Sequence, residues 1–241
     1  MIAGAFALPL VWITIKYGLG VSDRYLPSPL AVLQAVQDIQ PNVWIHLAFT
    51  SLRLGIGFVL GIVVGVFVAL LMIRSSAWQW FLTPIIQALR PVPAAAVVPF
   101  FLLWFGFSEW GRYLLVVTAI AFNIAVAAWQ ILQDIPDNHN AFFHSFKLKP
   151  GQLLWRYVLP RIVEGILPTL RFSLALAIGA VTISELLGSQ VGLGYLIQTS
   201  RSTFSLNVLF LAAILLGILS ALADMLLVIL WRYLTFWKRM L

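Results

Sequence analysis

The chain has 241 residues, of which 62% are hydrophobic and only 10% are charged. A soluble domain carries about 25% charged residues, so this chain has too few charges to cover a surface that faces water. Together with a mean hydropathy of +1.00, this excludes an ordinary soluble protein and favours a chain embedded in a bilayer. The absence of cysteine excludes disulfides, thiol catalysis and cysteine metal sites.

The net charge of +7 could indicate a nucleic-acid partner. In a membrane protein, however, a basic excess belongs to the cytoplasmic loops, which attract lysine and arginine. We therefore expect the lipid bilayer, and not nucleic acid, to be the partner of this chain.

Six stretches are long and apolar enough to cross a bilayer, which takes roughly 20 residues of helix. They are residues 2–20, 46–73, 80–105, 111–133, 165–187 and 206–231. The apolar runs are continuous and do not alternate with polar residues, which predicts helices and not a barrel. We expect an all-α membrane protein with about six transmembrane helices, in which residues 1–241 form a single transmembrane domain.

Basic residues gather in the connections 74–79 and 134–164 and in the tail from Arg232, more than in 21–45, 106–110 and 188–205. The positive-inside rule places the first group in the cytoplasm, and both termini with it. In the segment 21–45, Ser28 and Pro29 predict the start of a short amphipathic helix on the outer surface. The residues expected on its apolar face are Leu30, Leu33, Val36 and Ile39.

The second predicted span carries Gly57, Gly61 and Gly65, which are spaced four residues apart. Small residues at this spacing form a groove in which the backbone of another helix can approach closely. The groove can serve packing within one chain, or it can lie at a gate or at a dimer interface.

The third predicted span contains Pro91, Pro93 and Pro99, each of which lacks a backbone donor and disturbs a helix. In a membrane, broken helix is tolerated where it is buried in protein or lines a wet cavity. The stretch therefore indicates either a transport pathway or a helix that is merely kinked.

Charged and polar groups are few inside the predicted spans, where they usually face a partner or water. They are Arg53, Arg90, Asn123, Arg171, Glu185 and Asp224. Structural pairing is one interpretation of each and a role in transport is the other. The residues that we predict to border a translocation pathway are Arg90, Pro91, Pro93, Asn123, Ser184 and Glu185.

The histidines give no sign of a metal site. His139 and His144 are five residues apart and do not share a helix face, and no carboxylates accompany them. We expect His46, at the end of a predicted span, to be interfacial. No metal site is predicted, and no catalytic cluster lies at one depth of the spans.

The connection 134–164 is polar, basic and long, and it is predicted to contain two short helices, 137–147 and 150–159, the second ending before Pro160. An amphipathic structure on the cytoplasmic face indicates a docking surface for a partner. The phosphate-binding pattern GxxxxGK[ST] does not occur in the chain. If ATP drives this protein, another chain must bind it.

Two stretches carry a family resemblance. RPVPAAAVVPFFLLWFGFSEWGR and LLWRYVLPRIVEGILPTLRFSLALAIGAVTISELLGSQVGLGYLI resemble the third and fifth spans of ATP-binding-cassette (ABC) importer permeases of the nitrate, taurine, aliphatic-sulfonate and thiamine-precursor type. The resemblance covers roughly residues 20–235. It implies the type I ABC importer permease fold.

These permeases carry a cytoplasmic "EAA" motif, which aligns its Glu with Ala141, its two Ala with Phe142 and Phe143, and its Gly with Lys147. Only the Leu-Pro that follows is matched, by Leu159 and Pro160, so the first half of the motif is degenerate. The residues that the resemblance assigns to coupling with the ATPase are Ala141, Phe142, Phe143, Lys147, Leu148, Lys149, Pro150, Gly151, Gln152, Leu159 and Pro160.

The resemblance further implies the partners. Two permease copies, commonly a homodimer, join ABC ATPase subunits and a periplasmic or lipid-anchored binding protein in the bacterial inner membrane. ATP and magnesium bind to the ATPase, so this chain would bind no cofactor and would import a small polar solute without being an enzyme. The alternatives are an ion-coupled secondary transporter, with Asp224 or Glu185 as proton carrier, a membrane-embedded enzyme, or an assembly factor.

Overall fold

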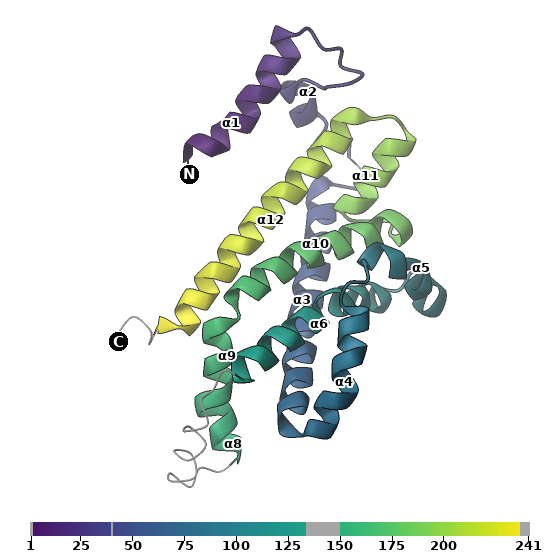
Figure 1. Cartoon of the computed structure of the whole chain (residues 1–241). Coiled ribbons are helices and arrows are strands. Elements are labelled where there is room, and N and C mark those ends of the chain that lie inside the picture. Colours follow the sequence, from purple (N-terminus) through teal and green to yellow (C-terminus); the bar gives the residue numbers. More distant parts are fainter. Residues whose placement is uncertain (1, 40, 134–149, 237–241) are drawn as a thin grey trace. The chain divides into compact units, whose positions relative to one another are not determined.

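The computed structural model describes residues 2–39, 41–133 and 150–236, and every regular element among them is a helix (Figure 1). The elements are α1 (Ile2–Ile13), η1 (Thr14–Gly18), α2 (Pro29–Gln34), α3 (Val43–Arg74), α4 (Ser76–Leu89), α5 (Ala94–Phe105), α6 (Glu109–Gln133), α8 (Pro150–Leu153), η2 (Leu154–Val158), α9 (Leu159–Gly165), α10 (Leu167–Gly188), α11 (Leu193–Ser202) and α12 (Leu206–Leu234). The two η elements are π-helical turns. The predicted all-α class is confirmed for these residues.

Within the described part of the chain, four helices are long and apolar enough to span a membrane, namely α3, α6, α10 and α12. The pair α4 and α5 passes the same test together, but it is bent by 104° at the break between its helices. The structure therefore supports four spans, or five if the bent pair counts as one, whereas the sequence predicted about six.

Two of the predicted spans account for the difference. The window 80–105 is not one straight helix, because the chain leaves the helical conformation around Pro91 and Pro93, and Pro93 has an extended backbone before α5. Pro99, in contrast, lies inside α5.

The window 2–20 contains the 12-residue α1 and then the π-helical η1, which begins at Thr14. The Thr14 hydroxyl donates to the carbonyl of Leu10 at 2.8 Å, and bonds of this kind bend helices.

The chain divides into two compact units. Unit 1 comprises residues 1–52 and 184–219, and unit 2 comprises residues 53–183 and 220–241. The helices α3, α10 and α12 each contribute one part to unit 1 and the other part to unit 2.

The core of unit 1 joins α2 to α11 and to the first part of α12. The helix α2 begins as predicted at Ser28, whose side chain accepts a hydrogen bond from the backbone N–H of Ala31 at 3.2 Å. It ends at Gln34, so the face predicted from Leu30 to Ile39 does not form, and Leu30 and Leu33 are exposed. The residues that form the buried core are Val32, Ala35, Ile39, Val43, Leu193, Leu196, Leu211 and Ala212.

In unit 2, α3 and α6 pack so closely that only glycine fits on the α3 side. A methyl group at Gly57 would lie 2.6 Å from Cβ of Val116, and one at Gly61 would lie 2.5 Å from the side chain of Ile120. A methyl group at Gly65 would lie 2.7 Å from the backbone oxygen of Ala121. The groove of small residues in the sequence is therefore filled by α6 of the same chain.

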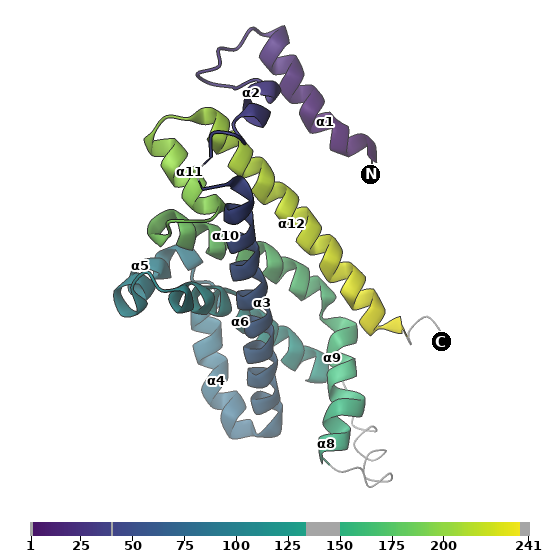
Figure 2. The same ribbon diagram turned by 180° about the vertical axis from the view of Figure 1, so that it is seen from behind.

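The helix α4 runs beside the unit 2 part of α3 in both views (Figures 1 and 2). Met72 of α3, Ile86 of α4 and Ala125 of α6 form a buried cluster between these three helices. The Trp231 side chain of α12 donates a hydrogen bond to the carbonyl of Val163 in α9, at 2.6 Å. These contacts give unit 2 a core of its own.

The helical stretch after residue 149 continues past Pro160, contrary to the prediction that it ends there. It runs through α8, η2 and α9, and Pro160 lies in the first turn of α9. Proline is accepted at this position because the first turn of a helix needs no backbone donor. The predicted helix 137–147 lies outside the described residues.

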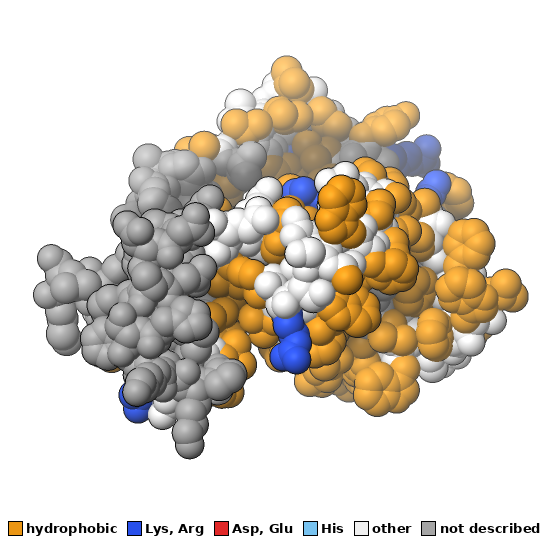
Figure 3. All heavy atoms as spheres, turned by 60° about the horizontal axis from the view of Figure 1, so that its bottom comes forward, with side chains coloured by type: hydrophobic (Ala, Val, Ile, Leu, Met, Phe, Trp, Pro, Cys, Tyr) orange, Lys and Arg blue, Asp and Glu red, His pale blue; other side chains and the backbone are white. Residues whose placement is uncertain are grey.

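Hydrophobic side chains cover most of the described surface in the space-filling view, with isolated lysine and arginine side chains between them (Figure 3). Large exposed apolar residues include Trp80, Leu103, Trp104 and Trp110, each more than 60% exposed. Water would not tolerate so much apolar surface on a single soluble chain, whereas hydrocarbon does.

Candidate functional site

The structure brings together two of the residues predicted for the translocation pathway, Arg90 and Asn123, within unit 2. Arg90 follows the last residue of α4, directly before the proline break, and Asn123 is on α6. The Nε of Arg90 donates a hydrogen bond to Oδ1 of Asn123 at 2.7 Å. Asn123 is buried, with 6% of its surface exposed, whereas Arg90 is exposed. The buried amide thus holds one edge of an exposed guanidinium.

Pro91 and Pro93 follow Arg90 and are also exposed. Since proline has no N–H and Pro93 has an extended backbone, the chain changes direction here by 104° between α4 and α5. The pair Arg90 and Asn123 therefore lies at the point where the span is broken.

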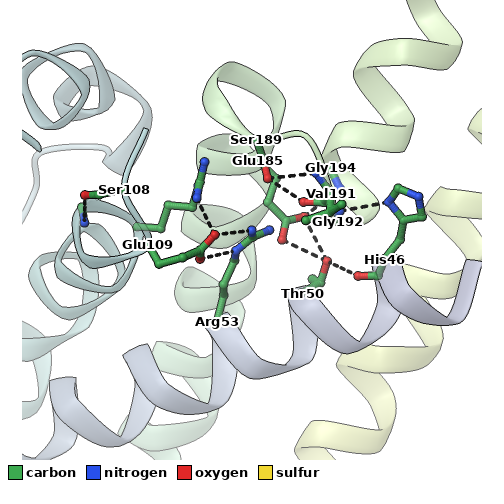
Figure 4. A network of polar contacts seen from close by, with 12 residues as sticks. His46, Thr50, Arg53, Ser108, Glu109, Glu185, Ser189, Val191, Gly192 and Gly194 are labelled. Carbon is green, nitrogen blue, oxygen red and sulfur yellow. Dashed lines mark hydrogen bonds and ion pairs between the residues drawn. The ribbon is translucent and has the colours of Figure 1, made fainter. Parts of the chain in front are cut away.

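Three other arginines of unit 2 that lie in candidate spans, Arg53, Arg112 and Arg171, have carboxylate partners. Arg53, 1% exposed, holds Glu109 through two contacts, from Nε at 2.8 Å and from a terminal nitrogen at 2.7 Å (Figure 4). Arg112 contacts the same carboxylate at 2.6 Å. Arg171 on α10 makes two bonds of 2.7 Å to Asp224 on α12. Bidentate pairs of this kind are the strongest that arginine forms with a carboxylate.

In unit 1, Glu185 is in the last turn of α10 and is fully buried, and its carboxylate lies beside the N-terminus of α11. Its carboxylate accepts a hydrogen bond from the backbone N–H of Gly194 at 2.9 Å, and the Thr50 hydroxyl lies 3.0 Å from both carboxylate oxygens (Figure 4). The Thr50 hydroxyl also accepts from the N–H of Leu193 at 2.8 Å. A carboxylate at this place is favourable because the first N–H groups of a helix lack partners within the helix.

His46 completes the cap of α11. Its Nδ1 accepts a hydrogen bond from the N–H of Gly192 at 3.0 Å, and its ring is stacked on that of Tyr195. His46 is fully buried within unit 1, which the sequence did not predict, whereas its expected position at the membrane interface stays a prediction. The cause of this burial is the Gly-Leu-Gly turn, which brings backbone donors to the first turns of α3.

Gly192 shows why this turn requires glycine. Its φ of +128° is a conformation that residues with a side chain rarely adopt. A methyl group there would also overlap the carboxylate of Glu185. The sequence Ser-Glu-Leu-Leu-Gly followed by Gly-Leu-Gly is therefore the signal of this cap, although the sequence alone did not identify Thr50 or His46 as its members.

The remaining predicted residues fall into three places. Ser184 is buried beside Glu185 in unit 1. Gly151 and Gln152 are exposed in α8, which begins at Pro150, whereas Leu159 and Pro160 are partly buried in α9. Six predicted coupling residues lie outside the described residues, and they are Ala141, Phe142, Phe143, Lys147, Leu148 and Lys149. Among the residues that the structure describes, no group of three His, Asp or Glu side chains is arranged to hold a metal ion.

The fold and these sites define a multi-pass membrane protein with a broken span, and comparison with known proteins gives its family. Residues 61–239 match the binding-protein-dependent transport system inner membrane components. The chain belongs to this family. It is therefore an inner-membrane permease component of a binding-protein-dependent ABC importer and not an enzyme.

Individual relatives cover most of the chain. It is 28% identical over 234 residues to the taurine transport system permease protein of Escherichia coli, covering 94% of this chain and 85% of the relative. It is also 28% identical over 198 residues to the formylaminopyrimidine transport permease protein of Halalkalibacterium halodurans, covering 82% of this chain and 79% of the relative. The predicted resemblance to permeases of the taurine and thiamine-precursor type is confirmed.

The fold is shared with a solved transporter. A chain in the inward-facing structure of the MetNI methionine ABC transporter superposes with a TM-score of 0.63 at 20% identity, over 86% of this chain and 97% of the other. At this identity the similarity shows the fold alone. The family match, and not this similarity of fold, sets aside the sequence-based alternatives of a stand-alone transporter, a membrane enzyme and an assembly factor.

Proposed function

We propose that this chain forms half of the translocation pathway of an ABC importer with the type I permease fold. Two copies would enclose the pathway, and a small polar solute would pass along the broken stretch Arg90–Pro93 of each. The solute would be delivered by a binding protein on the outer side. The chain would cross the inner membrane with both termini in the cytoplasm.

The observation that carries this proposal is the break between α4 and α5. A span bent by 104° exposes backbone groups that hydrocarbon cannot satisfy, so such a break belongs beside water or protein. Arg90 and Asn123 form a polar pair at the same place. An exposed arginine is costly against lipid, which also favours a water-filled path on this side of unit 2.

Coupling to ATP would occur at the segment around 141–152, which precedes and includes α8. This segment would dock on an ATPase subunit, and closure of the ATPase pair would move α8 and α9. The helical run from Pro150 to Gly165 supports this because it is nearly continuous and can transmit a displacement along its axis. Two alternating arrangements of the permease pair would then expose the pathway to either side.

The whole proposal is tested by purifying the chain from its native membrane in mild detergent, after crosslinking. We expect an ABC ATPase and a second permease copy to accompany it. Cysteine substitutions at Arg90, Pro91 and Pro93 in this cysteine-free chain should then react with a water-soluble thiol reagent while the complex turns over ATP. A chain that repeatedly purifies alone, or positions that all resist the reagent, would refute the assignment.

Coupling is tested separately by replacing Pro150 and Gly151 with alanine in the complete complex. We expect solute uptake to fall while ATP hydrolysis continues, because the segment would no longer transmit the movement of the ATPase. The exposed Ser76, on the same predicted side of the membrane, provides the control Ser76→Ala, which should leave both rates unchanged. Uptake at the wild-type rate in the double variant would show that the coupling segment lies elsewhere.

A further inference from the structure

We propose that Arg90 is a specificity-determining residue that binds the acidic group of an anionic solute during its passage. The inference rests on the proposed function, since it assumes that the broken span borders the pathway. It adds the class of solute, which is an oxyanion such as a sulfonate. The positive charge of a single arginine at the break would recognise it.

The geometry leaves most of the guanidinium available. Arginine has five N–H donors in a planar arrangement, and Nε is the one that Asn123 engages. Because Asn123 is buried, its amide fixes the plane of the guanidinium from one side. The outer edge of the guanidinium, formed by the two terminal nitrogens, can then bind two oxygens of one oxyanion.

The absence of a counter-ion distinguishes Arg90 from three other arginines of its unit. Arg53 and Arg112 share Glu109, and Arg171 has Asp224. Within the described residues of unit 2, no carboxylate contacts Arg90, and its described partner is a neutral amide. A cation held at the depth of a broken span without an opposite charge is unfavourable, unless an anion or water compensates it.

The identity of the partner at Arg90 is itself informative. Aspartate in place of Asn123 would have the same shape and would supply the missing charge at 2.7 Å from Nε. The chain has an amide there, so the guanidinium stays fixed but is not neutralised. This is the arrangement expected of a residue that is held in place by the protein and neutralised by a ligand.

The solutes named for two relatives supply the compounds for the test. The relative named for taurine handles a solute with a sulfonate, whereas the relative named for formylaminopyrimidine handles a solute without an acidic group. We would reconstitute the full complex, with its ATPase and binding protein, in proteoliposomes and measure ATP-driven uptake of taurine, ethanesulfonate and formylaminopyrimidine. The variants are Arg90→Gln, Arg90→Lys and Asn123→Asp, with Arg74→Gln as the control at an exposed arginine of the same unit.

The wild-type complex should take up a sulfonate. Removal of a charge-assisted contact corresponds to roughly a ten- to hundred-fold loss, so we expect that loss of sulfonate uptake in Arg90→Gln. Arg90→Lys should retain part of the rate, and Arg74→Gln all of it. Asn123→Asp should also lose sulfonate uptake, because the new carboxylate would occupy Arg90.

The Asn123→Asp variant distinguishes recognition from a structural role. If Arg90 only stabilised the break, a closer ionic partner would leave uptake unchanged or improve it. That result would overturn the inference, as would normal sulfonate uptake in a folded Arg90→Gln complex, or a wild-type complex that imports formylaminopyrimidine and no sulfonate. Failure of the wild-type complex to couple ATP to uptake of any solute would instead count against the proposed function.

Discussion

Glu185 in unit 1 and Arg90 in unit 2 are both charged residues near an interruption between two helices, but they differ in burial and in the number of their hydrogen-bond partners. The interruption is a glycine turn in one case and a proline break in the other. Glu185 is fully buried, and its carboxylate is bonded to a backbone N–H and a hydroxyl. Arg90 is exposed and bonded to one amide.

The difference shows how to separate structural polar groups from functional ones in a membrane protein. A charge whose bonding capacity is met by its own chain stabilises the fold, and a ligand could reach it only by breaking those bonds. A charge that is fixed on one side and open on the other can take a ligand without disturbing the helices. Glu185 was predicted to border the pathway, which stays a prediction, but its described contacts are those of a helix cap.

The largest effect that would test this comparison is expected for Gly192→Ala. The new methyl group would overlap the Glu185 carboxylate at a φ of +128°, so strain and overpacking should together cost about 3 kcal/mol. The measurement is the midpoint of SDS-induced unfolding. Gly217→Ala is the control, because Gly217 is inside α12 and a methyl group there meets no atom within 4 Å, so the variant should be unchanged or stabilised by up to about 1 kcal/mol. Equal midpoints for the two variants would contradict the cap.

A smaller effect, and a sharper contrast, is expected from Glu185→Gln and Arg90→Gln compared in the same unfolding assay. Loss of the carboxylate charge weakens the bonds to Gly194 and Thr50, so Glu185→Gln should cost about 2 kcal/mol. In Arg90→Gln the new amide can still donate to Asn123, so the loss should stay below about 1 kcal/mol. Should Arg90→Gln prove the more destabilising of the two, Arg90 would be the structural residue and the comparison would be reversed.

The sequence predicted the helical class, the main spans and the break at Pro91 and Pro93, because these depend on long apolar runs and on a residue without an N–H. It also placed Arg90 and Asn123 in one group, although only the structure shows that they touch. The groove of Gly57, Gly61 and Gly65 could be recognised from its spacing, but its partner, α6, could not.

The cap of α11 was beyond sequence reasoning for a physical reason. His46 and Thr50 lie more than 100 residues before the turn that they bind, with separations of 146 and 143 residues. No local pattern encodes such a contact, which depends on how α3 packs against α11. The two π-helical turns and the early end of α2 were missed likewise, because tertiary packing decides them.

The ion pair between Lys16 and Asp23 in unit 1 is a third type of charged contact, and its removal should change the stability least. Lys16 is buried and donates to the carbonyl of Val21 at 2.6 Å, and it forms an ion pair with the exposed Asp23 at 2.8 Å. The hydrogen bond that Lys16 donates to the Asp23 carboxyl holds the pKa of that carboxyl below its ordinary value. Because Asp23 faces water, the pair is screened and contributes little.

The sign of its pH dependence follows from the lowered pKa. A carboxyl whose pKa is lower in the folded state stabilises the fold above its unfolded pKa, and this contribution is lost as the pH falls through the folded pKa. Asp23→Asn should therefore be slightly less stable than the wild type at neutral pH and equal to it in strong acid. Thermal unfolding of both proteins in detergent across this range measures the difference. Asp38→Asn, at another exposed carboxyl of unit 1, is the control, and a difference for Asp23→Asn that grew towards acid would show that the ion pair does not stabilise this turn.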